Sequence, residues 1–173
     1  MSLRIPVGAR DHVLGPEDAP VTVVEYGDYQ CPYCGAAQPE VRKVLAHFGD
    51  NIRFVFRHFP LTEVHPMAAI AAVTAEFAGV HGQFWAAHEK LYANQSRLGP
   101  ELLFEIVQGL GLEPAELKAG IDADTWTEKV QEDFNGGIRS GVNGTPTFFI
   151  NGARHDGAYS FESLSQAIEA ARG

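Results

Sequence analysis

The sequence is poor in cysteine, has no long apolar run and carries no excess of basic residues. Its 173 residues include only two cysteines, too few for a disulfide framework. No apolar run approaches the roughly 18 residues that cross a bilayer, so we expect no integral membrane segment. Acidic residues outnumber basic ones by 22 to 13, for a formal net charge of −9. This balance argues against nucleic acid as a partner.

The first residues also lack the features of a signal peptide. "MSLRIPVGARDHVLG" has neither an apolar core nor a small-residue cleavage site. We therefore expect a cytoplasmic protein, with a periplasmic or other extracytoplasmic location as the alternative if a native signal peptide has been removed. The length and the 45% hydrophobic content suit one well-cored domain that could carry an insertion.

Two apolar stretches with a helical segment between them predict a β-α-β unit. The first, "VTVVEY" at Val21–Tyr26, is nearly all apolar or β-branched, as in a strand buried on both faces. A helix with one apolar face follows the cysteines and ends near Gly49, a favourable residue just beyond a helix. "IRFVFRHF" at Ile52–Phe59 predicts a second strand, parallel to the first through a right-handed crossover.

The apolar spacing becomes helical between residues 62 and 140 and returns to strands near the end. In that region apolar residues repeat every three or four positions, with breaks at glycine and proline. Thr147–Ile150, the pair Asn151-Gly152 and Ala153–Gly157 predict a β-hairpin. A final amphipathic helix is expected at about 161–171. The order β-α-β, helices, β-β-α indicates the α/β class.

The only two cysteines, Cys31 and Cys34, stand at the start of the first predicted helix in "YQCPYCGAAQPE". A disulfide between them would close so small a loop that it would constrain the unfolded chain little. A structural zinc site usually needs four cysteine or histidine ligands, and the sequence has no second CxxC. A metal cluster shared between two chains stays an alternative. The spacing favours redox chemistry, and we expect no metal site.

The position of Cys31 at a helix start favours its thiolate. Free N–H groups and the positive end of the helix dipole stabilise a negative charge there, and such cysteines have a pKa of roughly 3.5–7.5 rather than about 8.5. Pro32 suits the first helical position, where its missing N–H costs little. We expect Cys31 to be the exposed nucleophile and Cys34, one turn on, to be the deeper resolving thiol. Tyr29 and Tyr33 flank the pair closely enough to contact a substrate.

Three features together resemble the thioredoxin superfamily: "VVEYGDYQCPYC", Pro39 eight residues beyond Cys31, and the late "GVNGTPTFFING". The long helical insertion resembles the DsbA-like branch of that superfamily, and the resemblance extends from about Val13 to Ala171. It implies a thioredoxin fold around a central sheet. The core would comprise residues 11–61 and 141–173, with a helical insertion at 62–140 and an extended N-terminal segment at 1–10.

The resemblance also implies further site residues. It implies a cis bond between Thr145 and Pro146, facing the cysteines, where the backbone of an extended substrate pairs with the protein. Thr145, Pro146, Pro32 and Tyr33 are therefore expected to bind substrate. Glu25 matches a family acid on the central strand that relays a proton to or from the resolving thiol. Burial should raise the pKa of this carboxyl.

We therefore predict a thiol–disulfide oxidoreductase that exchanges disulfides with protein or peptide substrates through a mixed disulfide on Cys31. The Cys31–Cys34 pair would need no cofactor, and an unidentified redox partner would restore it. The residues do not fix whether the pair oxidises or reduces its substrates, and an isomerase is a rival function, although it usually accompanies a dimerisation domain that is not visible here. Two further alternatives stay open. "CPYC" is also a glutaredoxin motif, so a glutathione-dependent reductase is one, although glutaredoxins resemble a shorter core without the insertion. The other is a non-catalytic binding module or iron–sulfur carrier that uses the same cysteines.

Overall fold

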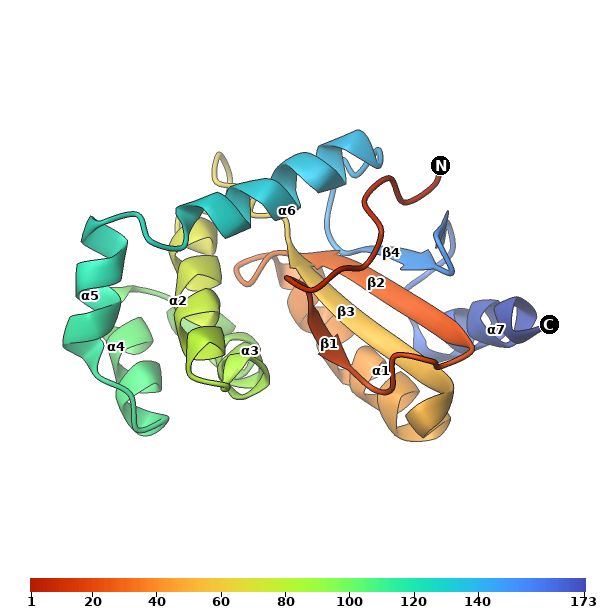
Figure 1. The fold of residues 1–173 in the computed structure, drawn as a ribbon, viewed down its shortest axis with the longest axis horizontal. Helices are drawn as coiled ribbons and strands as arrows, with labels where there is room; N and C mark the ends of the chain where they lie inside the picture. Colours follow the sequence, from red (N-terminus) through yellow and green to blue (C-terminus); the bar gives the residue numbers. More distant parts are fainter.

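A mixed five-stranded sheet forms the centre of the computed structural model, which describes residues 1–173 (Figure 1). The strands are β1 (His12–Leu14), β2 (Val21–Gly27), β3 (Ile52–His58), β4 (Thr147–Ile150) and β5 (Ala153–Arg154), and across the sheet their order is β1-β3-β2-β4-β5. The helices are α1 (Pro32–Phe48), α2 (Ala68–Val80), α3 (Phe84–Ala93), α4 (Pro100–Gly109), α5 (Pro114–Asp122), α6 (Thr127–Arg139) and α7 (Phe161–Arg172). Two short 3-10 helices, η1 (Gly49–Asn51) and η2 (Gln95–Arg97), complete the chain.

The predicted β-α-β unit is confirmed. β2 and β3 are parallel, with Val24 opposite Val55, and α1 connects them. The helix continues through Pro39 and ends at Gly49, which adopts a positive φ of 50°. Glycine takes that conformation without the steric cost that a side chain would add.

Strand β1 was not predicted from the sequence. It has three residues and pairs antiparallel with β3 at the edge of the sheet, with Val13 opposite Val55. Three residues are too few for an alternating pattern to be read. The segment is a strand because the exposed edge of β3 offers it backbone partners.

The two faces of the sheet are covered by different parts of the chain. Side chains alternate between the faces along each strand. One face packs against α1 and α7, through Val23, Phe54, Phe148, Val41, Val44, Leu164 and Ile168. The opposite face packs against α6 and the N-terminal segment, through Val24, Tyr26, Val55, Phe149, Phe59, Phe134, Leu3 and Val7. The N-terminal end of α1 is therefore held against a packed sheet.

Helices α2 to α6 lie between β3 and β4 in the chain, where a helical insertion was expected. Helices α2 to α5 gather beside the sheet, and α6 extends from them back over the sheet (Figure 1). α2 is buried along nearly all of its length, because it contacts α3, α4, α5 and α6. No helix of the chain combines the length and the apolarity needed to cross a membrane.

The predicted hairpin at the end of the sheet is confirmed, with a shorter second strand. Asn151 and Gly152 both have positive φ values, 47° and 81°, as a two-residue type I′ turn requires. The second strand ends at Arg154 rather than at Gly157. The hairpin places β4 next to β2, so that the residues just before β4 lie at the same end of the sheet as the start of α1.

Candidate active site

The two cysteines lie at the first turn of α1. Cys31 is the residue that precedes the helix, with extended backbone angles (φ −72°, ψ 122°), and Pro32 follows as the first helical residue. Both cysteines are free thiols. The carbonyl oxygen of Cys31 accepts a hydrogen bond from the backbone N–H of Gly35 at 3.1 Å. The helix thus begins at Cys31 and places Cys34 one turn inside.

The environment gives the two thiols opposite acidities. A hydrogen bond from the Cys34 thiol lowers the pKa of Cys31 to about 5, against the opposing effect of burial. Hydrogen bonding from Thr145 and from the backbone N–H groups of Cys34 and Tyr33 lowers this pKa further. Burial raises the pKa of Cys34 well above its ordinary value, and the same hydrogen bond to Cys31 adds to this rise. Near neutral pH the pair therefore carries one thiolate, on Cys31.

Cys31 is less exposed than the sequence predicted. Cys31 is only 3% exposed, and Cys34 is fully buried. The order of depth is as expected, but Cys31 itself is buried. Tyr33 is 65% exposed beside it, whereas Tyr29 is buried and cannot contact a substrate. The Tyr29 hydroxyl instead lies 2.8 Å from Nδ1 of the buried His88, so this ring serves packing.

Glu25 lies inside the protein on the same face of the sheet as α1. It alternates with Val24 and Tyr26, which face the other side, and its neighbour across the sheet is Phe148. Both carboxyl oxygens are buried without a hydrogen-bond partner. Burial raises the pKa of Glu25 to about 8, and its charge raises the pKa of Cys34. The predicted burial and raised pKa are confirmed; a role in proton transfer stays a prediction.

The segment before β4 meets the first cysteine. The peptide bond between Thr145 and Pro146 is cis. Sγ of Cys31 lies 3.5 Å from the carbonyl oxygen of Thr145. Two segments separated by 114 residues in the chain thus meet at the reactive sulfur. The other residues expected to bind substrate, Pro32 and Tyr33, are exposed on the first turn of α1.

A glutamine from the helical region, which sequence reasoning missed, holds the turn that carries the cysteines. Nε2 of Gln95 donates hydrogen bonds to the carbonyl oxygens of Cys31, at 2.7 Å, and of Tyr29, at 2.9 Å. The close approach requires glycine at position 35, where a Cβ atom would lie 2.3 Å from Oε1 of Gln95. Gln95 lies 64 residues from Cys31, so no local pattern indicates the contact.

Asp28 secures the loop between β2 and the cysteines. Its carboxylate accepts hydrogen bonds from the backbone N–H groups of Gln30, at 2.8 Å, and Leu61, at 2.9 Å. It also lies 2.8 Å from Nδ1 of His65. These contacts join the loop to the chain that follows β3. The dithiol is therefore held by side chains from both the core and the helical region.

A CxxC dithiol at a helix start, with the segment before β4 against its first sulfur beside a mixed sheet, is the arrangement of the thioredoxin-like class. The family model described as Thioredoxin matches residues 9–170. The chain belongs to this family, which confirms the expected resemblance and the thioredoxin-like fold.

Several solved structures share the fold of this chain. Oxidised BdbD from Bacillus subtilis is 28% identical with a TM-score of 0.84, covering 92% of this chain and 91% of that one. A thioredoxin-like oxidoreductase from Silicibacter pomeroyi DSS-3 is 30% identical with a TM-score of 0.80, covering 94% and 92%. Alpha-DsbA1 from Wolbachia pipientis shares the fold, with a TM-score of 0.85 at 21% identity over 99% of this chain and 94% of that one. These likenesses show that the chain has the fold of DsbA-like proteins.

Curated relatives match at higher identity but are much longer. The protein named Na(+)/H(+) antiporter NhaA 1 from Salinispora arenicola (strain CNS-205) is 48% identical over 172 residues, which make up 99% of this chain and 26% of the relative. The chain thus spans about a quarter of the length of the curated relatives it matches. Their name describes those whole proteins.

Proposed function

We propose that this protein exchanges disulfides with protein or peptide substrates, through a mixed disulfide on Cys31. The observation that carries the proposal is the placement of the CxxC turn at the start of α1, with Sγ of Cys31 3.5 Å from the Thr145 carbonyl oxygen and Cys34 fully buried. This placement shifts the two thiol pKa values in opposite directions. A thiolate is the attacking and leaving form of cysteine. The pair therefore has one sulfur suited to react with substrates and one suited to stay protonated.

In the oxidising direction the first step is attack by a substrate thiolate on Sγ of Cys31 in the Cys31–Cys34 disulfide. The S–S bond breaks, a mixed disulfide forms on Cys31, and Cys34 departs with the electron pair. A second substrate thiolate then attacks the substrate sulfur of the mixed disulfide. Cys31 leaves as a thiolate, and the substrate is released with its own disulfide. A leaving thiol of low pKa departs faster, so the lowered pKa of Cys31 favours this last step.

Glu25 is the group placed to supply the proton that Cys34 needs on leaving. With a pKa of about 8, its carboxyl is mostly protonated at neutral pH. Cys34 has a raised pKa and takes up a proton once the disulfide opens. The reverse transfer would occur when Cys34 attacks the mixed disulfide. Proton transfer by a positioned acid typically contributes about 10²–10⁴-fold to a rate.

The lowered pKa of Cys31 supports oxidation of substrates as the direction of exchange. The lowered pKa of Cys31 stabilises the folded, reduced protein. This stabilisation is fully present at pH values above the pKa of the unfolded thiol, about 8.5. The stabilisation is lost as the pH falls through about 5, the folded pKa of Cys31. Because only the reduced form has this thiolate, its stabilisation makes the disulfide form a stronger oxidant.

We further propose that Pro32, Tyr33, Thr145 and Pro146 bind the substrate segment. Tyr33 is exposed beside the reactive sulfur, and the Thr145 carbonyl adjoins that sulfur. An extended peptide could pair with the backbone before β4 while its cysteine faces Cys31. No cofactor is needed, and a separate redox partner would reoxidise the pair. A cytoplasmic location stays a prediction, with an extracytoplasmic one as its alternative.

The test is the equilibrium of the Cys31–Cys34 pair against a graded glutathione buffer. A potential nearer to about −120 mV than to about −270 mV would support the proposed direction, since these values belong to a strong oxidant and a reductase. A value at or below about −270 mV would contradict it. Faster reaction with glutathione than with a peptide thiol would favour the glutaredoxin-like alternative. Purification with bound iron and visible absorbance would favour the carrier.

A further inference from the structure

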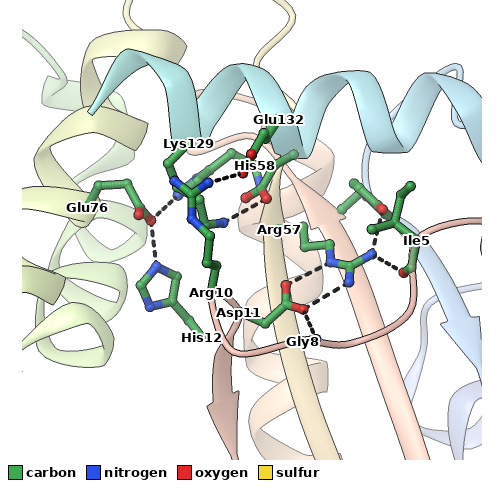
Figure 2. Close-up of polar contacts among 12 residues, drawn as sticks. Ile5, Gly8, Arg10, Asp11, His12, Arg57, His58, Glu76, Lys129 and Glu132 are labelled. Atoms are coloured by element: carbon green, nitrogen blue, oxygen red, sulfur yellow. Dashed lines mark hydrogen bonds and ion pairs between the residues drawn. The ribbon is translucent and has the colours of Figure 1, made fainter. Parts of the chain in front are cut away.

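Two histidines and a glutamate from three separate elements meet at one point (Figure 2). His12 lies in β1, His58 ends β3 and Glu76 lies in α2. Nε2 of His58 is 2.9 Å from Oε2 of Glu76, and Nε2 of His12 hydrogen-bonds to the same oxygen. One ligand atom from each residue lies within 4.8 Å of the other two. We call this group the His12–His58–Glu76 cluster.

The sheet register explains why the two histidines converge. His12 is paired with Phe56 on β3, and His58 lies two residues beyond Phe56. Residues paired across an antiparallel ladder share a face, and so do residues two apart on one strand. Both imidazoles therefore project from the same face of neighbouring strands. Glu76 reaches them from α2, a helix that lies beside this part of the sheet (Figure 2).

Aromatic packing fixes both imidazole rings. The ring of His12 stacks on Phe84, with centroids 3.6 Å apart and planes within 1°. The ring of His58 packs against Phe56 and Phe84. The side chain of His58 is 1% exposed, that of Glu76 8% and that of His12 19%. The two rings and the carboxylate are thus held in place, and the cluster is reached from solvent on the His12 side.

No second hydrogen bond fixes the tautomer of His58. Its Nδ1 is buried without a partner. Which ring nitrogen carries the proton is then set at Nε2 alone. Moving the proton to Nδ1 would leave the Nε2 lone pair directed at the point where the three residues meet, as a metal ligand requires.

The positive charges near the cluster are already paired. Nζ of Lys129 is 2.7 Å from Oδ1 of Asp133, and the other oxygen of Asp133 accepts a hydrogen bond from the backbone N–H of His58. Arg57 forms an ion pair with Asp11 at 2.8 Å. Glu76 is the one carboxylate of the cluster, and its only partners at hydrogen-bond distance are the imidazoles of His12 and His58. A cation at this point would meet the carboxylate of Glu76 and the Nε2 atoms of two imidazoles.

We propose that His12, His58 and Glu76 bind one divalent ion of the zinc type, although the sequence predicted no metal site. Two imidazole nitrogens and one carboxylate oxygen form a donor set typical of zinc, with ligand distances of roughly 2.0–2.2 Å. Imidazole donors favour zinc, cobalt or copper over calcium or magnesium. The present hydrogen-bonded contacts would open slightly to admit the ion, and a water molecule would complete a four-coordinate site on the His12 side.

The ion would tie three parts of the chain together. It would join the short edge strand β1 and the insertion helix α2 to β3, the strand from which His58 projects. An ion that binds the folded chain and not the unfolded one raises stability by mass action. Its role is therefore structural, and it takes no part in the exchange of disulfides.

The experiment uses the disulfide form of the full chain, so that the cysteines cannot chelate. The protein is titrated with Co²⁺, which reports coordination through its visible spectrum. We expect one ion per chain, strong bands typical of four-coordinate Co²⁺ without a thiolate charge-transfer band, and displacement by Zn²⁺. Paramagnetic shifts of the His12 and His58 ring resonances should accompany binding. Zn²⁺ should also raise the Tm of this form.

Variants test whether the residues of the cluster are the ligands of the ion. His12→Gln should weaken Co²⁺ binding by at least about 100-fold, because the loss of a ligand should cost as much as the 10–100-fold typical of outer-shell partners or more. His47→Gln, at an exposed histidine on α1, is the matched control and should bind as the parent does. Glu76→Gln, which keeps the side-chain size, serves if His12→Gln does not fold. Absence of the Co²⁺ bands in the parent, or parent-like spectra in the variants, would overturn the proposal.

Discussion

The dithiol centre and the His12–His58–Glu76 cluster use the same face of the sheet, but the chain builds them in opposite ways. Cys31 and Cys34 are three positions apart, at the start of one helix. His12 and Glu76 are 64 positions apart and meet only because β1 and α2 both pack beside β3. Chemistry contained in one turn can be read from the sequence, whereas chemistry shared among distant elements becomes visible only with the fold.

The two regions also differ in how they handle charge. In the dithiol centre, hydrogen bonds lower the pKa of Cys31, whereas burial raises the pKa of Cys34. In the cluster, Nε2 of His12 and Nε2 of His58 both contact the same carboxylate oxygen of Glu76. Substitutions in the first region should therefore act on reactivity, and those in the second on stability and metal binding.

The largest effect is expected from Cys31→Ser. Disulfide exchange should fall to the background rate, because the serine hydroxyl cannot form the mixed disulfide. Cys34→Ser should instead accumulate mixed disulfides on Cys31, which mass spectrometry of trapped substrates would detect. Insulin reduction measures the loss of exchange, with His47→Gln as an unaffected control. Trapping through Cys34 in the Cys31→Ser protein would reverse the assigned roles.

Glu25→Gln should slow exchange by about tenfold or more, since it removes the proposed proton donor. It should also stabilise the fold at higher pH. The raised pKa of about 8 means that the unfolded chain loses this proton first, so the parent loses stability between pH 4.5 and 8. The variant lacks this loss, and at pH 8 its free energy of unfolding should be greater by on the order of 3–5 kcal/mol.

Urea unfolding at pH 5 and pH 8 measures this difference for Glu25→Gln. Glu101→Gln, at an exposed position on α4, is the control and should follow the parent at both pH values. A gap between Glu25→Gln and the parent that does not widen with pH would contradict the raised pKa. An unchanged rate of exchange would remove Glu25 from the mechanism and leave the rest of it standing.

Glu76→Ala should act on the other region, by removing the shared acceptor of His12 and His58. Two mostly buried ring N–H groups would then lack a partner, which should lower the free energy of unfolding by about 2–4 kcal/mol. Denaturant unfolding in the presence of a chelator measures this loss apart from any metal effect. Glu101→Ala is the control, with an expected change within about 0.5 kcal/mol. A loss no larger than that of the control would show that the hydrogen bonds contribute little.

A smaller effect is expected from Gln95→Ala. The Gln95 side chain joins the helical region to the turn that carries the two cysteines. The loss of its two hydrogen bonds should cost about 1–2 kcal/mol in the reduced protein. Gly35→Ala should have a similar effect, because its Cβ would displace the Gln95 amide. Urea unfolding of both variants and of the double variant tests the link. Additive losses would contradict it, since residues that share one contact should not behave independently.

The sequence predicts the local parts of this molecule well. The strands at Val21–Gly27 and Ile52–His58, the helix after the cysteines and the Asn151-Gly152 hairpin follow from periodicity and turn chemistry. The reactive pair follows from its spacing and its place at a helix start. Each of these depends on residues close together in the chain.

What the sequence misses depends on packing between distant segments. The strand β1 forms because the edge of β3 is open, and Tyr29 is buried because His88 and Tyr92 pack against it. Gln95 reaches the dithiol turn from the helical insertion, 64 residues along the chain from Cys31. The burial of Cys31 likewise involves the segment before β4, where the Thr145 carbonyl oxygen lies 3.5 Å from its sulfur. None of these contacts leaves a pattern in the neighbouring residues.

The central claim is that Cys31 is the ionised sulfur of the reduced pair. The most direct test is the rate of iodoacetamide alkylation of the reduced protein as a function of pH, with the modified residue identified by mass spectrometry. The account predicts modification at Cys31 alone, with half-maximal rate near pH 5. A midpoint near the ordinary thiol value of about 8.5, or first modification at Cys34, would contradict it.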